Sequence, residues 1–138
     1  MRAFLIANVL CIAACGIVDA GSKEAQRTLT KVRVERIEKD LINAFRSDIP
    51  GLQTSAATTL LQVRKEVPEY SWSKCIIPLL RVVNDENSNP DARIAAALVL
   101  YELKSSHGNF SIVQNARFSS NARVKRFCSM LAAYHRLD

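Results

Sequence analysis

The segment DARIAAALVLYEL, residues 91–103, limits the fold of this chain more than any other stretch. Its composition favours a helix whose body is apolar on nearly every side. Asn89 or Asp91 can cap the start of that helix, and Pro90 suits its first turn, where the backbone N–H has no partner to lose. A helix that is apolar all round must be covered on more than one flank. We therefore predict that residues 91–103 form the central helix of a stack.

The rest of the chain repeats this helical pattern. Apolar residues between Val34 and Phe45 recur at the spacing of an amphipathic helix that ends before Pro50, and a second such helix reaches Val67. Further helices are expected at 75–85, at 108–118 and after the capping signal at 119–121. Glycine and proline, at four each, are scarce for an all-β fold with many tight turns. The sequence therefore predicts an all-α chain.

Aligning the second helix of each pair reveals an internal repeat. Ala92-Arg93 aligns with Leu52-Gln53, 40 residues earlier, and with Ala122-Arg123, 30 residues later. One helix pair is too small to bury its own apolar face, so neighbouring pairs have to stack. We predict a short right-handed α-solenoid of three antiparallel helix pairs, with repeats at about 34–67, 71–104 and 108–137.

Residues 75–103 carry a more specific pattern. An aliphatic helix containing Pro78 is followed by the turn Asn84-Asp85, and Asp91-x-Arg93 then opens an Ala/Leu-rich second helix. This pattern resembles HEAT repeats, in particular the bacterial type related to phycobilisome-lyase repeats. The resemblance implies that Asp91 and Arg93 bridge neighbouring repeats.

The outer repeats depart from this pattern. The first has Gly51 and Gln53 at the two positions, and the third has Asn121 and Arg123. The resemblance covers roughly residues 34–138 and is strongest in the middle pair. It concerns architecture, and a fold of this kind hosts many functions.

The N-terminus looks like an export signal. Arg2 precedes an apolar run that, even extended to Val18, is shorter than the roughly 20 residues of a membrane-spanning helix. Cleavage after the VDA motif would remove a signal peptide of residues 1–20. The IAAC motif at 12–15 instead resembles a bacterial lipobox, which would remove residues 1–14 and attach lipid to Cys15. Both cleavages predict location at the bacterial cell envelope, either lipid-anchored or soluble after export. The third alternative is an uncleaved N-terminal helix in a chain that is not exported, and residues 19–28 argue against it because they look like a polar linker.

Both cleavages leave the predicted helical domain intact. Residues 21–33 are expected to be a polar linker or an N-terminal extension of the first helix, and residues 34–138 form the repeat domain. With the signal removed, the chain still has enough residues to bury a core as one domain.

Positive charge is concentrated near the C-terminus. The net charge is +6, and residues 104–138 contribute +5 of it, six Lys and Arg against one Asp. A basic end on a neutral body indicates a local anionic partner rather than general nucleic-acid binding. Two interpretations fit the cations Arg117, Arg123, Lys125 and Arg126: a solvated polar cap on the end repeat, or contact with an anionic partner such as lipid headgroups, an acidic protein or a cell-wall polymer. The predicted adaptor uses them as the charged part of its partner-binding surface.

Residues with catalytic or ligand chemistry are few. His107 and His135 lack metal-ligand spacing, and no phosphate loop or nucleophile motif is present. Cys75 and Cys128 occupy apolar helix positions, which favours core packing, with a disulfide in an oxidising compartment as the alternative. We therefore predict no metal, no cofactor and no catalytic residues.

The sequence also predicts the exposure of three acidic residues and the burial of one aromatic residue. Glu35, Glu38 and Asp40 alternate with cations at helical spacing, which is typical of a solvated face. Tyr70 and Trp72 lie near a loop; burial of Trp72 between the first two repeats is favoured over an exposed aromatic anchor.

These observations favour a non-enzymatic adaptor that binds another protein at the cell envelope. The resemblance leaves open an enzyme on the same fold, because similar repeats occur in bilin lyases and in alkylpurine DNA glycosylases. An export signal argues against DNA as a ligand. A third alternative is a small structural subunit of an envelope complex.

Overall fold

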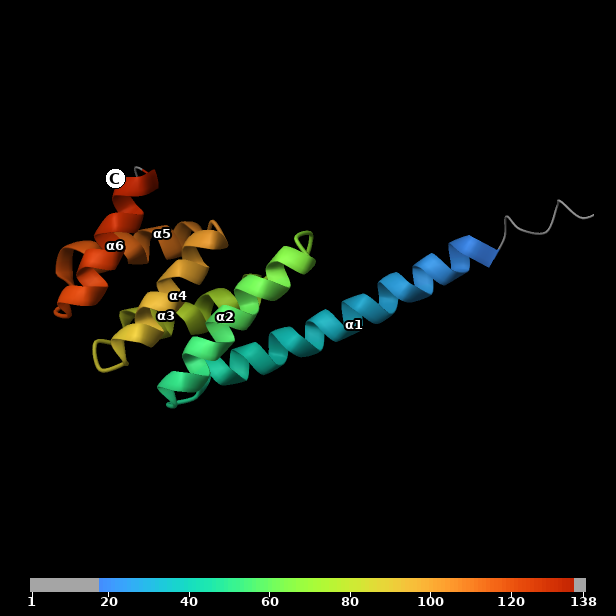
Figure 1. Ribbon diagram of the computed structural model, residues 1–138, viewed down its shortest axis with the longest axis horizontal. Coiled ribbons are helices and arrows are strands. Elements are labelled where there is room, and N and C mark those ends of the chain that lie inside the picture. The colour runs from blue at the N-terminus through green and yellow to red at the C-terminus, as the bar shows by residue number, and fades with distance from the viewer. Residues whose placement is uncertain (1–17, 136–138) are drawn as a thin grey trace, which may run out of the picture. The chain divides into compact units, whose positions relative to one another are not determined.

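The computed structural model describes the backbone of residues 18–135 and the side chains of residues 30–134. Cys15 and most of the candidate signal peptide lie outside the described residues. The helices, including the 3-10 helix η1, are α1 (Val18–Arg46), α2 (Pro50–Glu66), η1 (Ser73–Cys75), α3 (Ile76–Asn84), α4 (Pro90–Glu102), α5 (Ser106–Phe118) and α6 (Ala122–His135) (Figure 1). The described part is all-helical, which confirms the all-α class.

The chain divides into two compact units, and the division falls inside α1. The first unit ends at Arg36, and the second begins at Ile37 and holds the rest of α1 together with the later helices. Residues 21–33, for which the sequence allows a linker or a helical extension, lie within α1.

The second unit is built from packed helical hairpins. Its α3 packs against α4, and α5 packs against α6. Between the hairpins, α3 contacts α5, and α4 contacts α2, α5 and α6 (Figure 1). Helix α4 therefore touches four other helices, which confirms that residues 91–103 are covered on more than one flank.

Helix α4 is buried because small side chains let its neighbours approach closely. Its fully or nearly fully buried apolar residues are Ala92, Ala96, Ala97, Val99 and Leu100. At Gly108 of α5, an added Cβ would lie 2.8 Å from the Cβ of Leu100, so the contact between α4 and α5 has no room for a larger residue.

Side chains and one strained residue fix the helix starts. The Asn89 side chain caps α4 by accepting a hydrogen bond from the Asp91 N–H at 2.8 Å. Lys104 turns the chain between α4 and α5 with a φ of 52°, a conformation that side chains disfavour. The Ser105 Oγ then caps α5 by accepting from the Gly108 N–H at 3.2 Å.

Two large apolar residues are exposed. Phe110 of α5 is 66% exposed and Met130 of α6 is 56% exposed. In α5 the buried face is formed by Gly108, Ser111, Ile112 and Asn115, whose spacing turns Phe110 outward. Polar side chains therefore share the inner face of α5 with Ile112.

Candidate interaction surface

The cations predicted to bind a partner lie where α5 ends and α6 begins. The Asn121 side chain caps α6, because its Oδ1 accepts hydrogen bonds from the N–H groups of Arg123 at 3.0 Å and Val124 at 3.2 Å. This capping fixes the first turn of α6 and therefore the direction in which Arg123, Lys125 and Arg126 leave the helix. Arg117 lies in the last turn of α5.

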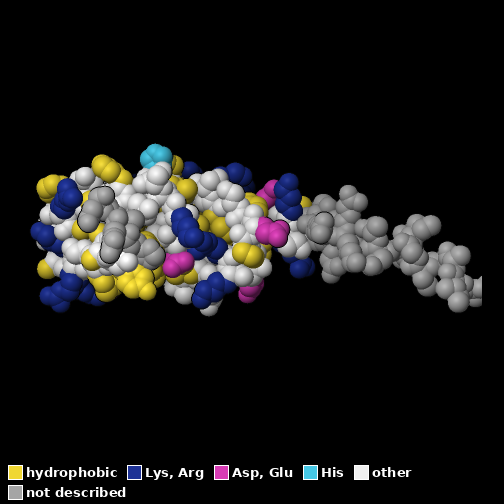
Figure 2. All heavy atoms as spheres, turned by 90° about the horizontal axis from the view of Figure 1, so that it is seen from above, with side chains coloured by type: hydrophobic (Ala, Val, Ile, Leu, Met, Phe, Trp, Pro, Cys, Tyr) yellow, Lys and Arg dark blue, Asp and Glu magenta, His cyan; other side chains and the backbone are white. Residues whose placement is uncertain are grey.

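All four of these cations are exposed. The Arg123 guanidinium pairs with the Asp91 carboxylate at 2.7 Å, with both side chains more than half exposed. Within the described residues, no carboxylate forms an ion pair with Arg117, Lys125 or Arg126. Figure 2 shows Lys and Arg side chains interspersed with apolar ones over the end formed by α5 and α6.

The placement of the α6 cations does not serve helix stability. Arg117 lies at a helix C-terminus, where a cation is favourable, but Lys125 and Arg126 lie in the first turns of α6, where cations oppose the helix dipole. The opposition costs some tenths of a kcal/mol per charge. A cluster of exposed cations creates a positive potential that attracts anionic groups.

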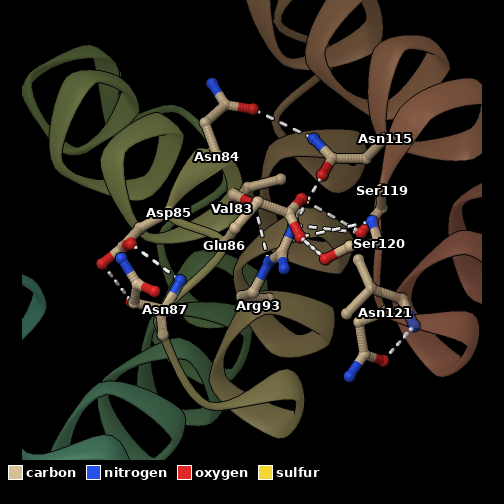
Figure 3. A network of polar contacts seen from close by, with 12 residues as sticks. Val83, Asn84, Asp85, Glu86, Asn87, Arg93, Asn115, Ser119, Ser120 and Asn121 are labelled. Atoms are coloured by element: carbon tan, nitrogen blue, oxygen red, sulfur yellow. Dashed lines mark hydrogen bonds and ion pairs between the residues drawn. The ribbon is translucent and has the colours of Figure 1, made fainter.

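A buried arginine in α4 links the residues that precede this surface. The Arg93 side chain is 0% exposed and donates hydrogen bonds to four residues outside α4 (Figure 3). Its Nε donates to the Val83 carbonyl at 3.0 Å. Its Nη2 donates to Glu86 Oε1 at 2.7 Å, to Asn115 Oδ1 at 2.8 Å and to Ser119 Oγ at 3.2 Å. Arg93 therefore ties the loop after α3 to the end of α5.

Glu86 extends the same network to the turn before α6. Its carboxylate accepts hydrogen bonds from the Ser119 hydroxyl at 3.2 Å and from both the hydroxyl and the backbone N–H of Ser120 (Figure 3). The hydrogen bonds from Arg93 and then from Ser120 lower the pKa of Glu86 to about 2. Glu86 is therefore charged at neutral pH and holds the α5–α6 turn in place.

Asn84 completes the connection between α3 and α5. Its Oδ1 accepts from the Ser111 hydroxyl at 2.7 Å and from the Asn115 amide at 3.0 Å. Sequence reasoning identified Arg93 through the family pattern but missed Ser111, Asn115 and Glu86. Polar residues at inward positions of α5 were the available signal.

The two described cysteines are free buried thiols. Cys75 and Cys128 are each 0% exposed and are not joined, so the disulfide alternative is not what the structure has. Burial raises the pKa of Cys75 to about 12, with a further contribution from Glu38, and burial raises that of Cys128 to about 11. Both thiols stay protonated at neutral pH, and a protonated thiol is a poor nucleophile.

The carboxylates Glu35, Glu38 and Asp40 of α1 differ in their exposure to solvent. Glu35 and Asp40 are exposed as expected, but Glu38 is only 2% exposed, so the prediction of a solvated face was wrong there. The Tyr70 hydroxyl donates to Glu38 Oε2 at 2.8 Å, and Lys74 Nζ lies 3.5 Å from the same oxygen. A long-range partner after α2 makes this burial tolerable, and helical spacing alone cannot reveal it.

The aromatic pair consists of Trp72 and Tyr70, the hydrogen-bond partner of Glu38. Trp72 is 3% exposed, which confirms its predicted burial. Its ring meets the Tyr70 ring edge-on, with centroids 4.8 Å apart. Trp72 is therefore a packing residue and not an exposed anchor for a partner.

A shallow cavity lies between α3 and α5. It measures about 400 Å³ and is lined by Leu80, Asn84, Ser106, His107, Phe110, Ser111 and Gln114. His107 is exposed at this cavity, and no Asp, Glu, Lys or Arg is among the lining residues. Within the described residues, no three His, Cys, Asp or Glu side chains lie together as a metal site would require.

None of the described helices has a stretch both long and apolar enough to cross a bilayer.

Comparison with known proteins yields no relative for this chain. No protein-family model matches it, and neither a curated protein nor a solved structure does so.

Proposed function

We propose that this protein is a non-enzymatic helical-repeat adaptor that binds an acidic protein partner at the bacterial cell envelope. The observation that carries the proposal is the set of exposed cations at the α5–α6 turn, which a partly buried hydrogen-bond network positions and which, in α6, helix stability explains poorly. Their proposed partner-binding members are Arg117, Arg123, Lys125 and Arg126.

We further propose that the helices form a HEAT-like, right-handed solenoid of three pairs. The packing of α4 against both α2 and α6, together with that of α3 against α5, supports this arrangement. In it, Asp91 bridges the second and third pairs through Arg123, and Arg93 bridges them through Asn115.

The proposed location depends on the N-terminal sequence. The short apolar run with its IAAC and VDA motifs supports export, and lipid attachment at Cys15 would hold the adaptor at a membrane surface. Mass spectrometry of the mature N-terminus tests this point. A lipidated Cys15 supports anchoring, a free Gly21 supports soluble export, and an intact Met1 contradicts both.

Charge reversal tests the binding surface. The double variant Arg123→Glu/Arg126→Glu should recover much less partner from an envelope extract than wild type, with an unchanged helical circular dichroism signal. The matched control is Lys39→Glu/Lys65→Glu, which makes the same charge change at exposed positions of α1 and α2. Equal loss in both double variants, or loss in neither, would contradict a role for the α5–α6 surface.

A further inference from the structure

The outer face of α6 changes character along its length. Arg123 and Arg126 are exposed near its start, whereas Met130, Ala133 and Tyr134 are exposed towards its end. Residues three, four and seven positions apart share one face of a helix. These side chains therefore form one stripe about 17 Å long, cationic in its first half and apolar in its second.

The opposite side of α6 faces the protein interior. Val124, Cys128 and Leu131 are buried there, and α6 packs against α4 and α5. Met130 is 56% exposed and Tyr134 is 80% exposed on the outer side. Two large side chains with this exposure, one helical turn apart, provide the apolar contact that a docked segment needs.

The order of charge and apolarity along the stripe identifies the kind of occupant. A helix that lies on a membrane separates its polar and apolar residues around its circumference, so that the apolar side faces the lipid along the whole length. On α6 the two kinds of residue follow one another along the same face. A flat bilayer presents the same chemistry along the whole length of a helix lying on it, so this order favours another helix with its own graded sequence over a membrane surface.

We infer that the partner segment is an α-helix with acidic residues along one half of its contact face and apolar residues along the other. This inference rests on the proposed adaptor function and names the partner's chemistry. The acidic half lies opposite Arg123 and Arg126, and the apolar half covers Met130 and Tyr134.

The charges set the register of this docking. Arg126 has no ion-pair partner within the described residues, and Arg123 shares its charge with Asp91 through an exposed contact. Exposed ion pairs contribute little affinity, but opposed charges direct a partner into one orientation. The apolar half supplies most of the binding free energy, because burial of apolar surface drives association.

Two synthetic helix-forming peptides of identical composition test the inference against the full chain. In the graded peptide, glutamates occupy the first half of one face and leucines the second half. In the isomer, glutamates and leucines lie on opposite sides along the whole length. Fluorescence anisotropy should show roughly tenfold tighter binding of the graded peptide. Equal affinities, or tighter binding of the isomer, would overturn the inference.

Variants of α6 locate the binding on the stripe. Arg126→Glu and Met130→Glu should each weaken the graded peptide about tenfold. Lys65→Glu makes the same charge change as Arg126→Glu, but Lys65 is an exposed residue of α2 and lies outside the stripe. Its effect should be less than twofold at moderate salt. Equal weakening by Lys65→Glu and Arg126→Glu would show general charge attraction instead of docking.

The same variants distinguish the inference from the proposed function. One contrary outcome is that the chain binds phosphatidylglycerol vesicles, that Met130→Glu abolishes this binding, and that the two peptides bind equally. This outcome would replace the helix partner with a membrane. Partner capture that depends on Arg123 and Arg126 while the two peptides bind equally would keep the adaptor function and reject the graded helix. Preference for the graded peptide with loss in Met130→Glu supports both.

Discussion

The Asp91 carboxylate lies 2.7 Å from the Arg123 guanidinium, so that an ion pair joins the first turn of α4 to the first turn of α6. The two residues are 32 positions apart in the sequence. Asp91 also lies where an anion stabilises a helix start. The pair therefore couples the orientation of a proposed binding residue to the central helix of the fold.

Replacing Asp91 with Asn should lower the free energy of unfolding by about 1 kcal/mol or less, because both partners of the ion pair are exposed to water. The same change should speed association with an acidic partner, since Arg123 loses its neutralising neighbour. Urea unfolding and stopped-flow binding measure the two effects. Asp40→Asn, an exposed change in α1, is the control for general charge effects. Slower association in the Asp91 variant would contradict the placement of Arg123 in the binding surface.

Replacing Arg93 with Met should be far more damaging, at about 3–5 kcal/mol of unfolding free energy, because the buried hydrogen-bond acceptors around it lose their donor. Arg81→Met, at an exposed position of α3, should change stability by less than about 0.5 kcal/mol. Adding Glu86→Leu to Arg93→Met should cost less than the sum of the single changes, because the two residues interact directly. Additive losses in this double-mutant cycle would show that the network is not coupled.

Stability should depend on pH through Glu86. Its pKa is lowered to about 2 from an ordinary value of 4.5, so folding favours the charged form. The contribution is fully present above about pH 4.5 and is lost as the pH falls towards 2. Urea titrations of wild type and Glu86→Gln should therefore differ at pH 7 and converge near pH 2. The difference should be small because the side chain is 45% exposed. A gap that widens on acidification would contradict this assignment.

Two glycines should respond to alanine in opposite directions. Gly108→Ala should destabilise the protein by about 1–3 kcal/mol, because the new Cβ would meet Leu100 at 2.8 Å. Gly51→Ala should stabilise it by about 0.5–1 kcal/mol, because Gly51 is helical and has open space around its Cα. Thermal unfolding of both variants provides the check. A neutral Gly108→Ala would show that α4 and α5 are not in tight contact.

Much of this fold could be predicted from the sequence because helix signals are local. The cap at Asn89, the capping signal at 119–121 and the apolar segment 91–103 each specify structure within a few residues. Burial that depends on partners far away in the sequence was harder to predict. Glu38 is buried through its contact with Tyr70, 32 positions away, and no local pattern contains that contact.

The candidate surface was predictable only in part. The excess of cations near the C-terminus was visible in the sequence, and the exposure of Arg117, Lys125 and Arg126 follows from helical spacing. The graded stripe was missed, because Met130 aligns with Leu60 and Leu100, which are fully buried. Among the described residues, no later helix covers Met130, so the same residue class is exposed there.

The central claim is that the α5–α6 surface contacts a protein partner, and site-specific photo-crosslinking in cells tests it most directly. A photoreactive residue is placed at Arg126, and matched controls carry it at Gln62 of α2 and Ile77 of α3, which are both exposed. We predict that the probe at position 126 crosslinks to a partner protein through an acidic segment of that partner. The yield of this crosslink should be much lower with the probe at position 62 or 77. Crosslinking confined to position 62 or 77, or equal at all three positions, would contradict it.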